Sequence, residues 1–160
     1  PDGANFHPGK TMKPDEVAQR LQQFESLCRE RGLPLTVQRR DILRTILERD
    51  DHPSADQVYE AVKGRIPGLS RTTVYRVLDT LVELGAVRRL HHPGSGARFD
   101  GKLQRHHHLV CRKCGCVIDI DNAGLDRLKV PAGQRHGFQI EDYSVHFTGL
   151  CQECRRQGPT

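Results

Sequence analysis

The sequence predicts an α+β protein with a helical N-terminal part and a C-terminal part built around a small sheet. Apolar residues recur at helical spacing as far as Gly85, and from about residue 106 the pattern changes to the alternation typical of strands. Two C-x-x-C pairs lie in the second part. A chain of 160 residues divided in this way gives each part only a modest core, so the cysteines are candidates for a stabilising metal site.

The charge balance favours a polyanion as partner. Lys and Arg number 25 against 20 Asp and Glu, and the sequence pI is about 9.1. No apolar run approaches the roughly 20 residues that cross a bilayer, and the N-terminus has no hydrophobic signal core. We therefore expect a cytoplasmic protein with no membrane partner.

The N-terminal part begins with an arm and a first helix. Residues 1–12 contain Gly, Pro and Asn without an apolar period, which predicts a flexible arm. Pro14 suits a first helical position, and Gly32 provides the stop of that helix. Its apolar face comprises Val17, Leu21, Phe24 and Leu27 or Cys28.

Residues that cap helix N-termini predict three further helices. The second helix ends before Pro53, the third opens with a capping box completed by Gln57, and Gly85 provides a left-handed stop for the fourth. The three capping residues are Thr36, Ser54 and Ser70.

A hairpin is expected after the fourth helix. Two short extended runs, Val87–Leu90 and Ala97–Phe99, flank a glycine-containing tip. Helix, turn, helix and hairpin together predict a winged helix-turn-helix domain over residues 13–99, in which the fourth helix reads DNA and the hairpin is the wing.

The fourth helix carries side chains that hydrogen-bond phosphates and base edges on the face not used for burial. Tyr75 and Arg76 are the predicted base contacts, and the two wing arginines are predicted to bind phosphate. A basic helix face is more often simply exposed to solvent. The DNA-binding interpretation therefore depends on the position of this helix just before a predicted wing. The predicted DNA-binding residues are Arg71, Thr72, Thr73, Tyr75, Arg76, Arg88 and Arg89.

Alternating segments predict an α/β domain over residues 106–160, joined to the first by a hinge at residues 100–105. A short helix is expected at Gly124–Lys129. The predicted strands are His108–Cys111, Cys116–Ile120, Phe138–Ile140 and Ser144–Thr148.

The two C-x-x-C pairs supply four thiolates, the number that a closed tetrahedral zinc site needs. Cys111, Cys114, Cys151 and Cys154 are therefore the predicted structural zinc ligands. Disulfides or redox-active dithiols are the alternative, disfavoured because neither pair has the context of a thioredoxin-like motif. Cys28 and Cys116 are interpreted as small buried residues rather than ligands.

A second candidate metal site precedes the first cysteine pair. In an extended segment His106 and His108 point to the same side, and Asp100 and Asp119 offer carboxylates from the end of the wing and the next strand. Two imidazoles with two carboxylates suit iron(II), manganese(II) or zinc. A solvated turn or an incidental chelator is the plainer reading of three successive histidines.

These motifs together resemble the ferric uptake regulator (Fur) superfamily over roughly residues 13–155. The resemblance rests on Leu35–Arg39, His52–Asp56, Thr72–Leu78, Arg98–Asp100, His106–Gly115 and Gly149–Cys154. It implies a homodimer whose C-terminal domain is the dimerisation domain, with a structural zinc on the four cysteines. It also implies repression at inverted-repeat operators of double-stranded DNA.

The resemblance places a regulatory metal on Asp100, His106, His108 and Asp119. In the peroxide-stress branch both carboxylates are typically aspartates, as here, and bound iron promotes oxidation of a histidine ligand. Iron-sensing members more often have Glu at the position of Asp100, and zinc-sensing members frequently have Cys. The pattern therefore favours a peroxide-sensing or iron-sensing repressor with Fe²⁺ or Mn²⁺, Zn²⁺ being possible at the same site.

One position departs from the family pattern. Many relatives carry a histidine ligand where this chain has Arg40. His52, His7 or water would complete the shell, or Arg40 would bridge to Asp100. The second metal site of some iron-sensing members also looks incomplete, because Arg105, His107 and Tyr143 occupy its expected ligand positions.

Three rival functions stay open at this stage. A zinc-uptake regulator would use the same fold, and a zinc-stapled DNA-binding protein would lack sensing altogether. An enzyme would use the His and Asp residues to activate water, but the sequence supplies no evident substrate pocket or general base. We therefore expect no enzymatic activity.

Overall fold

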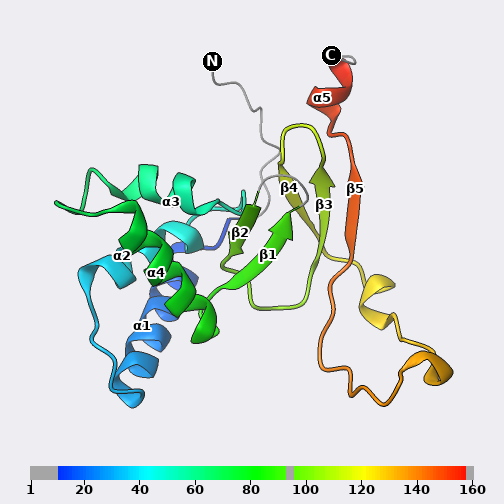
Figure 1. The fold of residues 1–160 in the computed structure, drawn as a ribbon, viewed down its shortest axis with the longest axis horizontal. Helices are drawn as coiled ribbons and strands as arrows, with labels where there is room; N and C mark the ends of the chain where they lie inside the picture. Colours follow the sequence, from blue (N-terminus) through cyan, green and yellow to red (C-terminus); the bar gives the residue numbers. More distant parts are fainter. Residues whose placement is uncertain (1–10, 93–95, 158–160) are drawn as a thin grey trace. The chain divides into compact units, whose positions relative to one another are not determined.

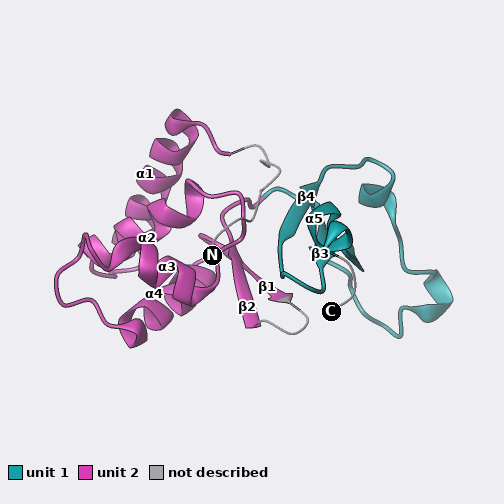
Figure 2. Ribbon diagram, turned by 90° about the horizontal axis from the view of Figure 1, so that it is seen from above, with its two compact units in different colours: residues 1–4, 104–160 teal, residues 5–103 magenta. Residues whose placement is uncertain are grey.

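The computed structural model describes residues 11–92 and 96–157. The chain divides into two compact units, with the boundary between Leu103 and Gln104 (Figure 2). Most of the predicted arm, residues 1–10, lies outside the described residues, as does part of the hairpin tip, residues 93–95. The two units are called here the helical unit and the sheet unit.

Four helices form the body of the helical unit, and the predicted caps begin three of them. Thr36 Oγ1 accepts the Arg39 N–H at 3.2 Å, Ser54 Oγ accepts the Gln57 N–H at 3.2 Å, and Ser70 Oγ accepts the Thr73 N–H at 3.1 Å. The helices are α1 (Pro14–Glu30), α2 (Val37–Leu47), α3 (Ala55–Val62) and α4 (Arg71–Glu83).

The apolar faces of these helices meet in one core (Figure 1). Side chains of α2 and α4 such as Ile42, Leu43, Leu78 and Leu81 are almost fully buried. Each contributes about 1.5–3 kcal/mol relative to an exposed position. Burial of this face leaves the opposite face of α4 in solvent, where the predicted DNA contacts lie.

The predicted wing is an antiparallel hairpin of β1 (Arg88–His92) and β2 (Gly96–Asp100). Phe99 is buried in the helical core, and its N–H donates to the Pro53 carbonyl at 3.0 Å. An isolated bridge between Ser54 and Arg98 adds a second link. The end of β2 is therefore tied to the segment just before α3.

The sheet unit has a three-stranded sheet in the order β4-β3-β5. The strand β3 (His107–Cys111) pairs antiparallel with β4 (Val117–Ile120) and parallel with β5 (His146–Gly149). The helix α5 (Gln152–Arg156) follows β5. Two 3₁₀ turns, η1 (Leu125–Arg127) and η2 (Ala132–Gln134), lie between β4 and β5.

Two predictions for this unit were wrong in detail. The helix expected at Gly124–Lys129 is only the 3₁₀ turn η1, and Phe138–Ile140 is not a strand. Both sides of β3 are occupied by β4 and β5. Among the described residues nothing pairs with Phe138–Ile140, and the Phe138 N–H instead closes a turn to Arg135 at 2.8 Å. A segment with alternating apolar residues does not form a strand unless a neighbouring strand pairs with it.

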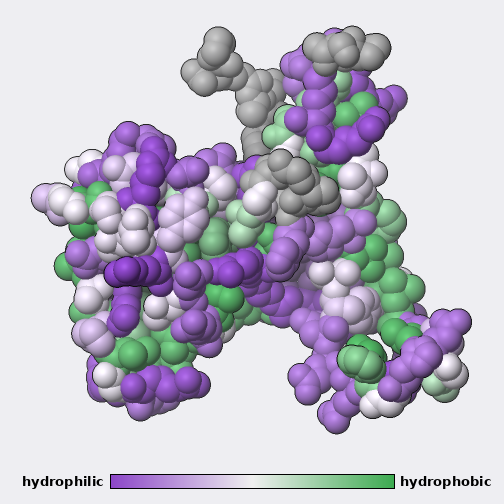
Figure 3. All heavy atoms as spheres, viewed as in Figure 1, coloured by the Kyte–Doolittle hydropathy of each residue, from purple (hydrophilic) through white to green (hydrophobic). Residues whose placement is uncertain are grey.

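The sheet unit leaves apolar side chains uncovered. Leu109 of β3 and Phe147 of β5 are register neighbours on one face, and each is 46% exposed. Figure 3 shows hydrophobic residues gathered along β5. Within the described ranges, no helix is long and apolar enough to span a membrane.

Candidate metal centres

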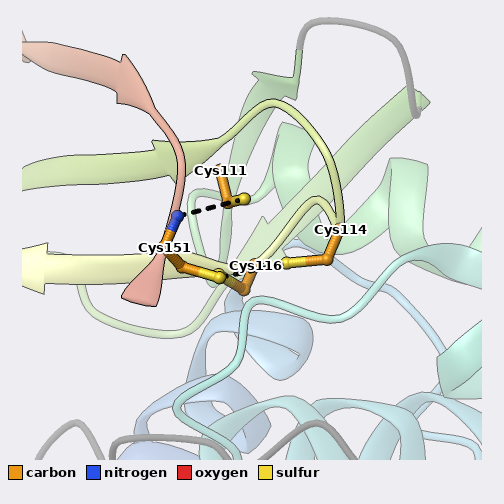
Figure 4. Close-up of side chains that lie close together, drawn as sticks. All are labelled: Cys111, Cys114, Cys116 and Cys151. Carbon is orange, nitrogen blue, oxygen red and sulfur yellow. Dashed lines mark hydrogen bonds between the residues drawn. The ribbon is translucent and has the colours of Figure 1, made fainter. Parts of the chain in front are cut away.

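Cysteines from both ends of the sheet unit converge at one point (Figure 4). Cys111 ends β3, Cys114 lies in the turn to β4, Cys116 directly precedes β4, and Cys151 follows β5. Their Sγ atoms all lie within 4.8 Å of one another. The cysteines thereby bring together the two ends of the segment that runs from β4 through β5.

The sulfur spacing fits a tetrahedral ion. With Zn–S bonds of about 2.3 Å, two sulfurs of a tetrahedral site lie about 3.8 Å apart. Cys114 Sγ and Cys151 Sγ are 3.7 Å apart. A disulfide has its sulfurs about 2.05 Å apart, so Cys114 and Cys151 are not joined by one in this structure. All six cysteines are free thiols.

The pKa of the Cys111 thiol lies below its ordinary value. Burial would raise its pKa, but N–H groups of Cys114, Cys151 and Lys113 point at its sulfur and lower the pKa to about 6. The Cys151 N–H, for example, lies 3.3 Å from Cys111 Sγ. A metal that binds thiolates is favoured at such a sulfur.

Cys154 joins the same cluster from α5. It is buried, and its N–H donates to Cys151 Sγ at 3.4 Å. Burial and thiol hydrogen bonds to Cys151, Cys114 and Cys111 raise its pKa to about 12. The structure therefore groups the sulfurs of three of the four predicted cysteines, Cys111, Cys114 and Cys151, and Cys154 lies beside Cys151. It adds Cys116, which spacing alone had set aside.

A second group of donors lies along β3 and β4 of the sheet unit. His106 Nε2 is 3.5 Å from Asp119 Oδ1, and His108 Nε2 is 3.9 Å from the same oxygen. The pairing of His108 with Asp119 across the two strands produces this approach. All three side chains are at least nine-tenths buried.

These donors fit a shared cation. Ligands bound at about 2.0–2.2 Å in a tetrahedral site lie about 3.4 Å apart, which is close to the observed spacing. His106 Nδ1–H donates to the Gln104 carbonyl at 2.8 Å, and its Nε2 faces Asp119. Such a bond from the remote ring nitrogen orients ligating histidines in general.

Asp100 and His52 lie together in the helical unit. His52 Nε2 is 3.8 Å from Asp100 Oδ1, and both side chains are 3% exposed. Asp100 Oδ1 also accepts the Lys102 N–H at 2.8 Å. The link between Phe99 and Pro53 holds these two segments in register. His52 has φ +49, a strained left-handed backbone for a non-glycine residue.

Arg40 is turned toward α1. Its Nε donates to Glu25 Oε1 at 2.7 Å, so the bridge to Asp100 that the sequence allowed is not what the structure shows. Arg20 is the arginine whose charge interacts with Asp100. It donates to the carbonyls of Gly101 at 2.9 Å and Ala86 at 2.7 Å, and burial lowers its pKa while Asp100 opposes that shift.

His107 is fully buried and is used for hydrogen bonding. Its Nδ1 accepts the Val145 N–H at 3.1 Å, so its Nε2–H donates to Asp126 at 3.2 Å. Tyr143 stacks against the ring, and the Arg105 guanidinium lies 4.7 Å from the centroid of Tyr143. The resemblance had indicated an incomplete second metal site at Arg105, His107 and Tyr143. The contacts described here involve the same three residues.

The outer face of α4 presents Thr72, Tyr75 and Arg76 to solvent, with Tyr75 48% exposed. Thr73 is only half exposed and contacts Ser70 Oγ at 2.9 Å, so part of its polar capacity serves the helix cap.

The other predicted DNA-binding arginines have protein partners. Arg71 pairs with Asp56 and Glu60, Arg89 pairs with Asp79, and Arg88 donates to the Leu103 carbonyl at 2.7 Å. Exposed ion pairs are worth only about 0–1 kcal/mol, so a phosphate can replace such carboxylates.

The model of the ferric uptake regulator family matches residues 30–148. The chain belongs to the ferric uptake regulator family. It is 33% identical over 141 residues to the peroxide operon regulator of Bacillus subtilis, covering 88% of this chain and 97% of the relative. It is 29% identical over 144 residues to the peroxide-responsive repressor of Staphylococcus epidermidis, covering 90% and 96%.

Solved structures give the same assignment. The ferric uptake regulator of Vibrio cholerae superposes with a TM-score of 0.65 at 28% identity, covering 80% of this chain and 99% of that one. The predicted α+β fold and the resemblance to this family are confirmed. The chain is accordingly a metal-sensing, DNA-binding transcriptional repressor of this family.

Proposed function

We propose that this repressor holds its operator when a regulatory ion is bound at His106, His108, Asp119 and Asp100, and releases it when peroxide oxidises that site. The observation that carries the proposal is the buried approach of two imidazole Nε2 atoms to one Asp119 oxygen, at 3.5 and 3.9 Å. These three donors, one just before β3, one on β3 and one on β4, make up three of the four proposed ligands. Asp100 would add a ligand from the helical unit.

The donor set selects the ion by chemistry. Imidazoles with carboxylates suit Fe²⁺ or Mn²⁺, and also Zn²⁺, whereas thiolates favour zinc. We therefore assign Zn²⁺ as a structural ion to Cys111, Cys114, Cys151 and Cys154, and Fe²⁺ or Mn²⁺ to the regulatory site. Both regulatory carboxylates are aspartates, and the two relatives described above are named for peroxide.

His52 is the helical unit's second donor for the regulatory ion. It supplies the imidazole that the family pattern places at position 40, where this chain has Arg40 engaged with Glu25. Because Asp100 and His52 lie together, metal binding would act on the segments at the end of β2 and before α3. An ion shared with the sheet unit would restrict the hinge between them and shift the population of DNA-binding conformations.

Replacing His52 with Asn tests this ligand. Asn tolerates the left-handed backbone but removes the imidazole, so we expect affinity for Mn²⁺ to fall about 10–100-fold. Zinc content stays unchanged. Titration with Mn²⁺ followed by electron paramagnetic resonance measures the change. His136→Asn is the matched control, because His136 is exposed and also has positive φ, +46. Equal affinities for the two variants contradict a ligand role for His52.

The exposed face of Leu109 and Phe147 is our candidate dimer interface. Edge strand β5 and its neighbour present apolar side chains that no other described segment covers. A second copy of the chain, related by twofold symmetry, would bury the same residues on both sides. A symmetric dimer would then place two α4 helices on an inverted repeat.

Phe147→Asp is expected to dissociate this dimer. An unpaired charge buried in the interface costs about 3–5 kcal/mol, which raises the dimer dissociation constant at least about a hundredfold. Sedimentation equilibrium measures the constant. Val37→Asp is the control, because Val37 is an apolar residue of α2 that is 72% exposed. A dimer of Phe147→Asp as tight as the control would exclude this face.

Peroxide release is the direct test of the proposed stimulus. The zinc-loaded protein is bound to an operator fragment with either Fe²⁺ or Mn²⁺ and then treated with hydrogen peroxide. We expect release only from the iron form, with one added oxygen in the peptide containing His106 and His108. Release from both forms at the same peroxide concentration argues against iron-dependent oxidation.

We further propose that the protein acts in the cytoplasm and is not an enzyme. Two of its relatives are named as a repressor and an operon regulator. Turnover of activated esters or phosphate esters by the metal-loaded protein, abolished by His106→Ala, would oppose this proposal. Recovery of the protein outside the cytoplasmic fraction of its host would oppose the proposed location.

A further inference from the structure

The cysteine cluster contains one more thiol than a tetrahedral ion uses. Cys116 lies with Cys111, Cys114 and Cys151 in a group whose Sγ atoms are all within 4.8 Å of one another (Figure 4). Cys154 lies beside the same cluster, since its N–H donates to Cys151 Sγ at 3.4 Å. Two sets of four sulfurs are therefore available, and they differ only in whether Cys116 or Cys154 completes them.

The backbone explains why Cys116 faces the cluster. Gly115 adopts φ +74, and its N–H donates to the Cys111 carbonyl at 2.9 Å. The Cys111 N–H in turn donates to the Cys116 carbonyl at 2.9 Å. This tight turn brings the residue after Gly115 back beside the two preceding cysteines. Three of the thiols thus come from one hairpin.

The two candidate fourth ligands differ in how they are held. Cys116 is fixed between the hairpin turn and β4, whereas Cys154 belongs to the separate five-residue helix α5. Recruiting Cys116 needs no movement of a separate segment, so it costs little conformational entropy. Cys116 is also partly buried, and its Sγ lies within 4.8 Å of those of Cys114 and Cys151.

We propose that Cys116 is an alternative fourth zinc ligand, which completes a four-sulfur site with Cys111, Cys114 and Cys151 when Cys154 is absent or displaced. This inference rests on the proposed zinc site. A fifth thiol beside a closed site recaptures the ion when one sulfur leaves. The site then loses zinc more slowly than a site with four cysteines alone.

Cys154→Ser tests the proposal through metal content and coordination. We expect about one zinc per chain and four sulfur ligands by zinc X-ray absorption. The double variant Cys154→Ser with Cys116→Ser is expected to lose zinc or to show three sulfurs. Cys154→Ser with Cys28→Ala is the matched control, because Cys28 is buried in the helical unit, and it is expected to keep four sulfurs. Three sulfurs with one lighter ligand in Cys154→Ser would overturn the proposal.

A second measurement avoids any folding defect at α5. Cys116→Ser keeps the four predicted ligands, and we expect it to release zinc to a chelator about tenfold faster than the unmodified chain, the size of effect seen when a supporting group is lost. Release at the unmodified rate would count against Cys116. If the unmodified chain holds no zinc on sulfur, the zinc site itself fails, which is a different outcome.

Discussion

Replacing Cys111 and Cys114 together with Ser is expected to unfold the sheet unit while the helical unit stays folded. At most three thiols then remain near the site, too few for a closed four-sulfur shell. Binding of structural zinc supplies about 10–16 kcal/mol of apparent folding free energy, which matches or exceeds the total stability of a small domain, about 5–15 kcal/mol. The helical unit has its own buried core.

Hydrogen exchange by segment measures this effect. We expect the amides of β3, β4 and β5 to lose protection, and those of α2 and α4 to keep it. The double variant Cys28→Ala with Cys116→Ser removes the same number of thiols and retains the four predicted ligands, so its strands should stay protected. Loss of protection in both units together would show that they do not fold separately. Protected strands without zinc would contradict the stabilising role of the ion.

Replacing His106 and His108 together with Ala is expected to abolish the gain in operator affinity that Mn²⁺ or Fe²⁺ produces. Allosteric coupling of about 1–3 kcal/mol corresponds to a gain of about 5–150-fold. Without the two imidazoles, only carboxylates and His52 remain as proposed ligands of the ion. The affinity of the ion-free protein is expected to stay at its unmodified level.

Both histidines are buried, so truncation also leaves cavities. Asp119→Asn keeps the size of the side chain and removes only its charge, and it should reduce the same gain. His136→Ala, at an exposed position, should leave the gain intact. Fluorescence anisotropy with a labelled operator at constant salt measures all four proteins, because salt alone changes DNA affinity strongly. An undiminished gain in the double variant and in Asp119→Asn would refute the site.

Local features were predictable from the sequence because their causes are local. Thr36, Ser54 and Ser70 cap α2, α3 and α4 as expected, since a capping bond joins residues only three apart. Three of the four paired cysteines, Cys111, Cys114 and Cys151, also meet in one cluster. Phe138–Ile140 shows the limit. Its alternation is strand-like, but a strand needs a partner, and partners are set by the whole topology.

Two site features escaped the sequence interpretation for a related reason. Cys116 falls outside the C-x-x-C spacing, and only the left-handed turn at Gly115 brings it to the cluster. His52 was one of several possible substitutes for the histidine missing at position 40. Its place beside Asp100 follows from the bonds between Phe99 and Pro53, which sequence spacing does not reveal.

The central claim is that an ion at the His and Asp donors controls DNA binding, separately from zinc on the cysteines. Operator affinity of the zinc-loaded protein, measured at constant salt with and without Mn²⁺, tests it most directly. We predict affinity about 5–150-fold tighter with Mn²⁺, with the zinc content unchanged. Equal affinity with and without the ion, while Mn²⁺ is bound, would contradict the account and leave a zinc-stabilised DNA-binding protein that does not sense metal.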